Sequence, residues 1–348
     1  MSQQPLLTTT VDVSQGGSQL PADPTLPGLA LLGRPAELTA MLSRLVAPWL
    51  GAGAHLLDSR AHLRRLAPGK RCSVELELVV GRENGVPAEH RRLLGKLYRE
   101  DQGATVYRTL EELRGHGFGA GRFLVPQPLA YVPEYRLLLL TWAEGDVLSS
   151  VLLAGSDAAE KIEGAATWLL GLHQCGVRTG RRYSFRGHLQ TLAKWKELLT
   201  DVYPEGERLL ADLLARFEDR GKELSASTPG PTHRDFSPEH LVVRDDRFTG
   251  LDFDEFCQYD SVFDVAHFIS HLRLLGLTHC GSLNHFDGLA DRFLAAYAAG
   301  GGDCSAERLK LYGAIAYFKL GRFVSLVQRP PNWMPILREL LSEARRLV

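Results

Sequence analysis

The sequence has few cysteines and no arrangement of them that would hold a metal or a disulfide framework. It contains 5 cysteines in 348 residues, and they are widely scattered. None of them forms a C-x-x-C pair. An odd, scattered set is more typical of a reducing compartment than of a secreted disulfide scaffold. We therefore predict a cytoplasmic protein without a zinc ribbon.

Net charge and long apolar runs are also nearly absent. Lys plus Arg number 40 and Asp plus Glu number 41, so no basic field favours nucleic acid or an anionic membrane. No apolar run reaches the roughly 18 residues that a membrane helix needs, and the first residues carry no basic cluster followed by an apolar core. The sequence predicts neither a nucleic-acid nor a membrane partner, and small-molecule chemistry is the better expectation.

The composition predicts a tail and two lobes. Residues 1–28 are rich in Ser, Thr, Gln, Pro and Gly, which is typical of a disordered tail. Residues 29–143 combine helical and strand patterns, which predicts a small α+β N-lobe that binds nucleotide. Its expected helices are 35–50 and 104–113, and its expected strands are 74–78, 92–98 and 137–140.

Residues 144–348 have mainly helical periodicity, which predicts a helical C-lobe carrying the catalytic loop and the acceptor site. The expected helices are 158–173, 188–202, 206–224, 262–275, 286–299, 306–328 and 335–348. One short segment interrupts them. Residues 241–243 form an apolar run, 245–246 supply a turn, and 248–253 restart the apolar pattern, as in a β-hairpin.

The residues on either side of this hairpin are the most informative in the chain. His233-Arg234-Asp235 precedes it and Leu251-Asp252-Phe253-Asp254 ends it. Phosphoryl transfer from ATP needs two carboxylates, one beside the attacking hydroxyl and one on magnesium. A hairpin between Asp235 and Asp252 would hold both of them over one cleft.

This pattern resembles the catalytic loop and metal-binding segment of the kinase-like phosphotransferases, the superfamily of aminoglycoside phosphotransferases and choline kinases. The resemblance implies a bilobal protein-kinase-like α+β fold that binds ATP and Mg²⁺. It also implies transfer of the γ-phosphate to a hydroxyl of a small molecule, of aminoglycoside, sugar or amino-alcohol type. Asp235 is then the catalytic residue that accepts or orients the hydroxyl proton, and Asp252 is a metal ligand.

A small acceptor is favoured over a polypeptide. Only 12 positions separate Asp252 from Asp264, and no Ala-Pro-Glu closes a long activation segment. In the resembled families the aspartate at the place of Asp264 fixes the catalytic loop, so we expect it to support that loop. The sequence does not identify the acceptor or the oligomeric state.

His240 departs from the family pattern, which has Asn at this place. Asn offers a hard amide oxygen to a second metal, whereas imidazole offers a softer nitrogen. Three roles stay open for His240: ligand to a Mn²⁺-like ion, hydrogen bond to the catalytic loop, or simple packing. The departure also keeps an alternative open, a pseudokinase or binding module without transfer activity.

Asp254 is a further candidate metal ligand. If the strand continues through Asp252, two residues later Asp254 points the same way and assists at the metal. The alternative is that it only caps a turn.

The N-lobe supplies the expected nucleotide contacts. The resemblance places Lys96 where a strand lysine contacts the α- and β-phosphates, although an exposed strand lysine is the alternative. Gly69 lies in a turn whose backbone N–H groups would cover the phosphates. Thr141, Trp142 and Ala143 follow the apolar strand where a kinase hinge presents its backbone to adenine.

Two further sets of residues have open or non-catalytic interpretations. The acidic residues after the hairpin either face a cationic or polyol acceptor or are solvated loop carboxylates. His267 and His271 lie at i, i+4 on one predicted helix but lack the Glu of a zinc H-E-x-x-H motif, so we expect core or surface roles. The acidic set is Asp252, Asp254, Glu255, Asp260 and Asp264.

Overall fold

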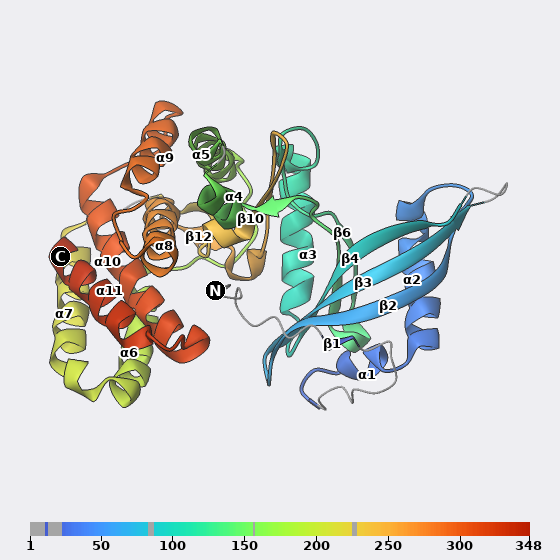
Figure 1. Cartoon of the computed structure of the whole chain (residues 1–348), viewed down its shortest axis with the longest axis horizontal. Coiled ribbons are helices and arrows are strands. Elements are labelled where there is room, and N and C mark those ends of the chain that lie inside the picture. The colour runs from blue at the N-terminus through green and yellow to red at the C-terminus, as the bar shows by residue number, and fades with distance from the viewer. Residues whose placement is uncertain (1–10, 13–22, 83–86, 156, 225–227) are drawn as a thin grey trace. The chain divides into compact units, whose positions relative to one another are not determined.

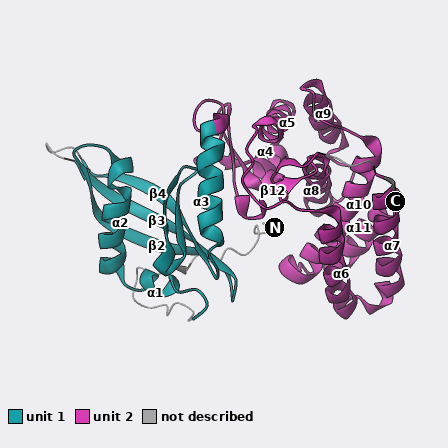
Figure 2. Cartoon of the chain, turned by 180° about the vertical axis from the view of Figure 1, so that it is seen from behind, with its two compact units in different colours: residues 1–115, 125–143 teal, residues 116–124, 144–348 magenta. Residues whose placement is uncertain are grey.

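The chain folds into two compact units. The computed structural model describes residues 11–12, 23–82, 87–155, 157–224 and 228–348. One unit comprises residues 1–115 and 125–143, and the other comprises 116–124 and 144–348 (Figure 2). Each unit has its own hydrophobic core. The predicted fold class is confirmed, because the N-terminal part is rich in sheet and the C-terminal part is mostly helical.

The first unit is built on one antiparallel sheet with the strand order β1-β2-β3-β4-β7-β6 (Figure 1). The predicted pairing of β3 with β4 is confirmed, and it sets Lys96 opposite Ser73. The strands are β1 Val11–Asp12, β2 Ala54–Ala67, β3 Arg71–Arg82, β4 Glu89–Tyr98, β6 Pro128–Val132 and β7 Leu137–Thr141.

Strand β2 was not predicted from the sequence. Its pairing with β3 contains two register shifts, one between Leu56 and Asp58 and one between Leu63 and Arg65. Each β-bulge adds a residue and so breaks the alternation of apolar and polar side chains. The longest strand of the sheet is therefore concealed from a search for period-two patterns.

Helices α1 (Leu29–Leu32), α2 (Pro35–Leu50) and α3 (Gln102–Leu113) complete the first unit. The predicted helix α2 begins with Pro35, which fits a first helical turn because its missing N–H would be unpaired there. It buries Leu38, Leu42 and Val46, spaced by four residues, and packs against β2.

The predicted disordered tail differs from the structure at its end. Leu26 is buried in the core of the first unit, and the Asp23 carboxylate accepts the Gly69 N–H at 2.7 Å. A buried leucine supplies the apolar contact that the composition of residues 1–28 did not indicate. Residues 1–10 and 13–22 of the tail lie outside the described residues.

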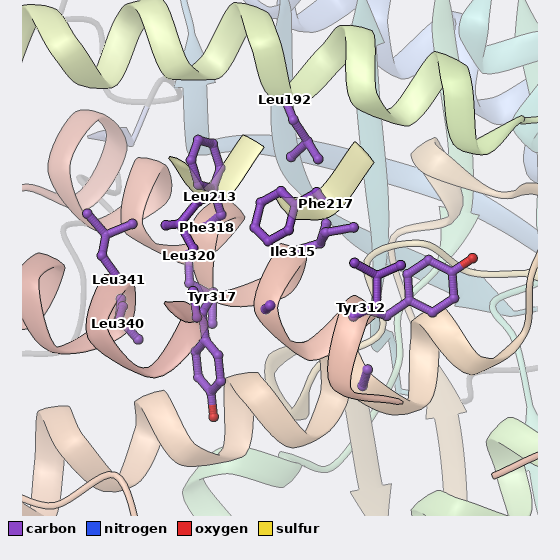
Figure 3. Close-up of a cluster of buried hydrophobic side chains, with 14 of the residues drawn as sticks. Leu192, Leu213, Phe217, Tyr312, Ile315, Tyr317, Phe318, Leu320, Leu340 and Leu341 are labelled. Atoms are coloured by element: carbon purple, nitrogen blue, oxygen red, sulfur yellow. The ribbon is translucent and has the colours of Figure 1, made fainter. Parts of the chain in front are cut away.

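The second unit is mainly helical, and the seven predicted helices are confirmed in position. A short helix, α4, was not predicted. Helix α10 lies at the centre of the core and packs against α6, α7, α8 and α11. Figure 3 shows side chains from α6, α7, α10 and α11 meeting there, including Leu192, Phe217 and Phe318. The helices are α4 Leu148–Ala154, α5 Ala158–Gln174, α6 Phe185–Val202, α7 Glu207–Glu223, α8 Val262–Cys280, α9 Asp287–Ala299, α10 Ala306–Phe323 and α11 Trp333–Leu347.

The predicted hairpin consists of β10 (Leu241–Arg244) and β11 (Arg247–Gly250), which pair antiparallel. Two short strands extend it, giving the order β5-β11-β10-β8. A separate ladder pairs β9 (Gly230–Thr232), just before the catalytic loop, with β12 (Cys257–Tyr259), just after the hairpin. The remaining elements are β5 Phe123–Leu124, β8 Asp146–Val147 and the short helical turns η1 Arg114–Phe118, η2 Pro133–Tyr135, η3 Pro204–Gly206, η4 Pro238–His240, η5 Phe253–Glu255 and η6 Val324–Gln328. Every helix among the described residues is too short or too polar to cross a lipid bilayer.

Candidate active site

Asp264 of α8 fixes the backbone of the predicted catalytic loop, as expected. Its carboxylate accepts the N–H of His233 at 2.6 Å and the N–H of Arg234 at 2.7 Å. A third contact joins it to Nε2 of His173 on α5 at 3.1 Å. Asp264 is fully buried, so these charge-assisted hydrogen bonds satisfy a carboxylate that has no access to water. The bonds also hold Arg234 in the left-handed region, at φ 64°.

The carboxylate of Asp235 is held by Lys319, which comes from α10. The Lys319 ammonium donates to Oδ1 of Asp235 at 2.7 Å, to Nε2 of His267 at 2.9 Å and to the Arg234 carbonyl at 3.2 Å. A lysine has three N–H donors, so all of them are used within the site. The Lys319 contact fixes one oxygen of Asp235 and distinguishes it from the other.

Neighbouring charges keep Asp235 ionised. Burial raises the pKa of its carboxyl, but the charges of Lys319 and His240 more than offset this and hold the pKa well below its usual range. His267 is neutral, because burial and the Lys319 charge place the pKa of its imidazole well below the usual value. The neutral ring donates from Nδ1 to the Phe236 carbonyl at 2.9 Å, which leaves the Nε2 lone pair for Lys319.

His240 lies between the two aspartates of the motif. Its Nδ1 donates to the backbone carbonyl of Asp235 at 2.7 Å, so one of its three open roles, a hydrogen bond to the catalytic loop, is observed. Because that bond fixes the proton on Nδ1, the neutral ring directs Nε2 towards Oδ2 of Asp252, which is 3.7 Å away. The two aspartates raise the pKa of His240 although burial lowers it.

Asp235, His240 and Asp252 are together able to hold a metal ion. Each offers one ligand atom, and the three atoms lie within 4.8 Å of one another. Two carboxylate oxygens and one imidazole nitrogen suit a divalent cation that accepts mixed donors, such as Mn²⁺, better than one that prefers oxygen alone. The donor set therefore fits a metal, with His240 as the unusual member.

His233 connects the catalytic loop to the segment that carries Asp252. Its Nε2 donates to the carbonyl of Leu251 at 2.8 Å, and the N–H of Leu251 donates to the carbonyl of His240 at 2.8 Å. The ring is fully buried against Phe253, with centroids 4.8 Å apart. These contacts fix the position of the Asp252 segment relative to the loop that carries Asp235.

The condition under which Asp254 would point the same way as Asp252, a strand that continues through both residues, is not met. Strand β11 ends at Gly250, Asp252 has the left-handed φ of 60°, and Phe253–Glu255 form a 3-10 turn. The left-handed residue reverses the chain direction, so side chains no longer alternate across a strand. Among the described residues, Asp254 is not part of the three-residue cluster. A metal role for it remains a prediction without that support.

The acidic residues after the hairpin do not form one exposed surface. Asp260 and Asp264 are buried within the second unit. Asp260 contacts the Tyr312 hydroxyl at 3.2 Å and Arg308 at 3.5 Å. Glu255 lies 3.6 Å from Arg181. Two of the five carboxylates are therefore bound internally and cannot face an acceptor, whereas Asp252, Asp254 and Glu255 keep exposed surface.

The predicted phosphate contacts Lys96 and Gly69 lie in the first unit. Lys96 is on β4 between Ser73 of β3 and Leu138 of β7, and it is 8% exposed. Gly69 has a φ of 70° in the turn between β2 and β3, a conformation that favours glycine. Its N–H is bonded to Asp23, so a phosphate oxygen at this N–H would replace a carboxylate oxygen.

The predicted adenine contacts follow strand β7. The N–H of Thr141 donates to the Gln127 carbonyl at 2.9 Å, and its hydroxyl accepts the Gln127 N–H at 2.8 Å. The ring of Trp142 lies under the Arg92 guanidinium at 4.7 Å. Because the Thr141 N–H is already bonded, the prediction narrows to the backbone of Trp142 and Ala143.

Sequence reasoning missed Lys319 and undervalued His267. Lys319 is the one charged residue in the apolar segment 311–321, and a lone lysine there is a recognisable signal of an internal ion pair. His267 is buried as expected, yet its Nε2 faces Lys319. His271, on the same helix, pairs with Glu239 at 3.6 Å.

Comparisons with known proteins identify a family and a fold for the chain. A family model described as the phosphotransferase enzyme family matches residues 86–312. No curated protein gives a significant match.

Solved structures share the fold at low sequence identity. A spectinomycin phosphotransferase in complex with ADP and spectinomycin has a TM-score of 0.60 and 11% identity, over 90% of this chain and 98% of that one. An amicoumacin kinase with AMP-PNP and Ca²⁺ has a TM-score of 0.58 and 13% identity, over 82% and 88% of the two chains. A choline kinase from Cryptosporidium parvum has a TM-score of 0.57 and 10% identity, over 89% and 94%.

Proposed function

Because the chain belongs to the phosphotransferase enzyme family, we propose that it transfers the γ-phosphoryl group of ATP to a hydroxyl of a small molecule. One observation carries the proposal. Asp235 is an ionised carboxylate with Oδ1 held by Lys319, while Oδ2 lies on the side of His240, 3.7 Å from its Nδ1. The similar structures contain ADP or AMP-PNP, and one of them holds spectinomycin, which supports a nucleotide and a small acceptor.

In the proposed reaction, Oδ2 of Asp235 accepts the acceptor's hydroxyl proton as the oxygen–phosphorus bond forms. The bond from the γ-phosphorus to the bridging oxygen breaks, and ADP leaves. Lys319 keeps Asp235 ionised and oriented, so little reorganisation is needed at the moment of reaction. Lys96 and the Gly69 turn contact the phosphates, and the backbone of Trp142 and Ala143 contacts adenine.

Asp252 and His240 would hold the divalent cation, which would neutralise phosphate charge, and this leaves Oδ2 of Asp235 free to accept the acceptor's proton. Since imidazole is a softer donor than an amide oxygen, we propose that Mn²⁺ supports activity better than Mg²⁺. The His240→Asn variant offers an oxygen in its place and should shift the preference towards Mg²⁺. Activity in both metals, measured for both proteins, checks this; an unchanged Mn²⁺ to Mg²⁺ ratio contradicts ligation by His240.

The main test measures ATP consumption with a panel of hydroxylated compounds, and product mass identifies an added phosphate. Asp235→Asn should lower kcat about 1000-fold, because the general base is lost. Nucleotide binding, measured as a rise in melting temperature with ATP and Mn²⁺, should persist in this variant. Full turnover by Asp235→Asn would refute the role of Asp235. Nucleotide binding with no acceptor product would instead favour a binding module.

A further inference from the structure

Arg322 of α10 carries a half-buried positive charge that has no counter-ion among the described residues. Its Nε is buried and has no hydrogen-bond partner, and no carboxylate of the described residues forms an ion pair with it. Burial alone lowers the pKa of its guanidinium, with no negative group to offset this. A partly desolvated cation without a partner is costly, so the fold retains it against its own stability.

The guanidinium is nevertheless held in a defined place. It lies over the ring of Trp195, 5.0 Å from the ring centroid. Trp195 is on α6, which packs directly against α10. A guanidinium stacked on an aromatic ring keeps the edges of its fork free for an oxyanion, which it can bind through two parallel hydrogen bonds.

This place is close to the catalytic carboxylate. Arg322 follows Lys319 by three positions on the same helix, and residues three apart are neighbours on one helical face. Lys319 contacts Asp235 directly and has all three donors occupied. The two cations therefore differ: Lys319 is saturated by the site itself, whereas Arg322 is not.

Exposed apolar side chains lie on α6 and on η6, the segment that follows α10 directly. Leu198 of α6 is 45% exposed and Val327 of η6 is 46% exposed, and both are large apolar side chains open to solvent. Helix α6 packs against η6, which follows α10 directly. Exposed apolar side chains on elements that carry or adjoin such a cation suit a ligand with an apolar body.

We propose that Arg322 and Trp195 bind an anionic group, a carboxylate or phosphate, of the acceptor whose hydroxyl reaches Asp235. The acceptor is then a hydroxylated acid with an apolar or ring-shaped body, and Arg322 determines specificity. This inference rests on the proposed phosphotransfer function and narrows its acceptor class away from cationic compounds.

The test compares compounds that differ only in charge. One set is D-glucose, D-glucosamine, D-glucuronate and D-glucose 6-phosphate, in which the last two separate carboxylate from phosphate. A second set with an apolar body is 3-phenyllactate, 3-phenyl-1,2-propanediol and phenylalaninol. Binding is measured by saturation-transfer NMR and calorimetry with ADP and Mn²⁺ present, so that no turnover is required.

The wild-type protein should bind an anionic member about 10- to 100-fold more tightly than its neutral counterpart, as expected for hydrogen bonds to a charged group. Arg322→Gln should remove this difference, and Arg322→Lys should restore part of it. Arg329→Gln is the matched control, because Arg329 also lies over a tryptophan, Trp333, at 5.7 Å, but is exposed. Its anion preference should equal that of the wild type.

The inference is overturned if no compound binds the wild type better than Arg322→Gln, or if neutral or cationic members bind as well as anionic ones. Melting temperatures with and without ATP and Mn²⁺ show that each variant is folded. They also separate the two proposals. A wild-type protein that binds no nucleotide refutes the proposed function, whereas nucleotide binding without anion preference refutes only the role of Arg322.

Discussion

The two units use charged side chains in different ways. On the sheet of the first unit, charges pair across strands, as Arg64 and Arg92 do with Glu75 at 3.3 and 3.6 Å. Both arginines are 40% exposed although Glu75 is buried, so solvent screens the arginine side of each pair. Around the catalytic loop of the second unit, Asp264 and Lys319 each serve three partners away from bulk water. We expect the surface ion pairs of the first unit to tolerate the loss of one side chain. In the network of the second unit, each side chain contacts several others, so the loss of one affects them all.

The largest effect on stability should come from Asp264→Asn. The amide keeps one acceptor oxygen, but its NH2 group replaces the other and faces the backbone N–H of either His233 or Arg234. We expect a loss of about 3 kcal/mol in the free energy of unfolding, because a buried charged network is broken. Urea denaturation measures it. Asp212→Asn, on an exposed pair with Arg216 at 2.9 Å, is the control and should change little. Equal losses in both variants would contradict the comparison.

Removal of Lys319 should act on turnover more than on stability. Lys319→Met leaves Asp235 without its fixed hydrogen bond, and we expect kcat to fall about 100-fold, with the KM for ATP nearly unchanged. Lys319→Arg should recover part of the loss. Lys310→Met, an exposed lysine of the same helix, is the control. In the double variant that carries Lys319→Met and Asp235→Asn, kcat should be almost the same as in Asp235→Asn alone. If the two losses in kcat multiplied in full, the two residues would act independently.

Buried histidines should make the second unit sensitive to acid. Burial, with the charges of Arg234 and Lys319, places the pKa of His188 well below 6.5 in the folded protein. Between that value and about 6.5 the unfolded chain binds a proton that the folded chain does not. Stability is therefore complete above this range and falls as pH decreases, by about 1.4 kcal/mol per pH unit for one histidine.

The measurement is the free energy of unfolding between pH 7 and 5. His188→Gln should reduce the slope by that amount, while His233 and His267 still contribute. His279→Gln removes an exposed histidine of α8 and should leave the slope as it is. An identical slope in wild type and His188→Gln would mean that His188 is protonated in the folded state.

The smallest effect is expected in the first unit. Arg64→Ala removes one partner of Glu75, and Arg92 remains within 3.6 Å. We expect a change of about 0.5 kcal/mol, because Arg64 is 40% exposed and the buried Glu75 keeps Arg92 as a partner, and a smaller change at high salt. A loss comparable to that of Asp264→Asn would erase the distinction between the units.

Local patterns predicted most of the helices, the β10–β11 hairpin and the proximity of Asp235 to Asp252. These features depend on periodicity and turn residues that lie close together in the sequence. Three features were beyond such reasoning. The bulges of β2 disrupt its alternation, the left-handed Asp252 changes the direction of Asp254, and the Lys319 contact joins residues 84 positions apart. No local signal encodes a tertiary contact of that range.

The separation of these residues along the sequence also sets the order in which the site can assemble during synthesis. Asp264 comes 31 residues after His233, and Lys319 comes 84 residues after Asp235. A chain emerging from the ribosome presents the motif first. The N–H groups of His233 and Arg234 then lack the Asp264 acceptor until α8 follows, and the Asp235 carboxylate lacks Lys319 until α10 follows. Competence for chemistry is therefore among the last properties that the second unit acquires during synthesis, after the core around α10 has formed.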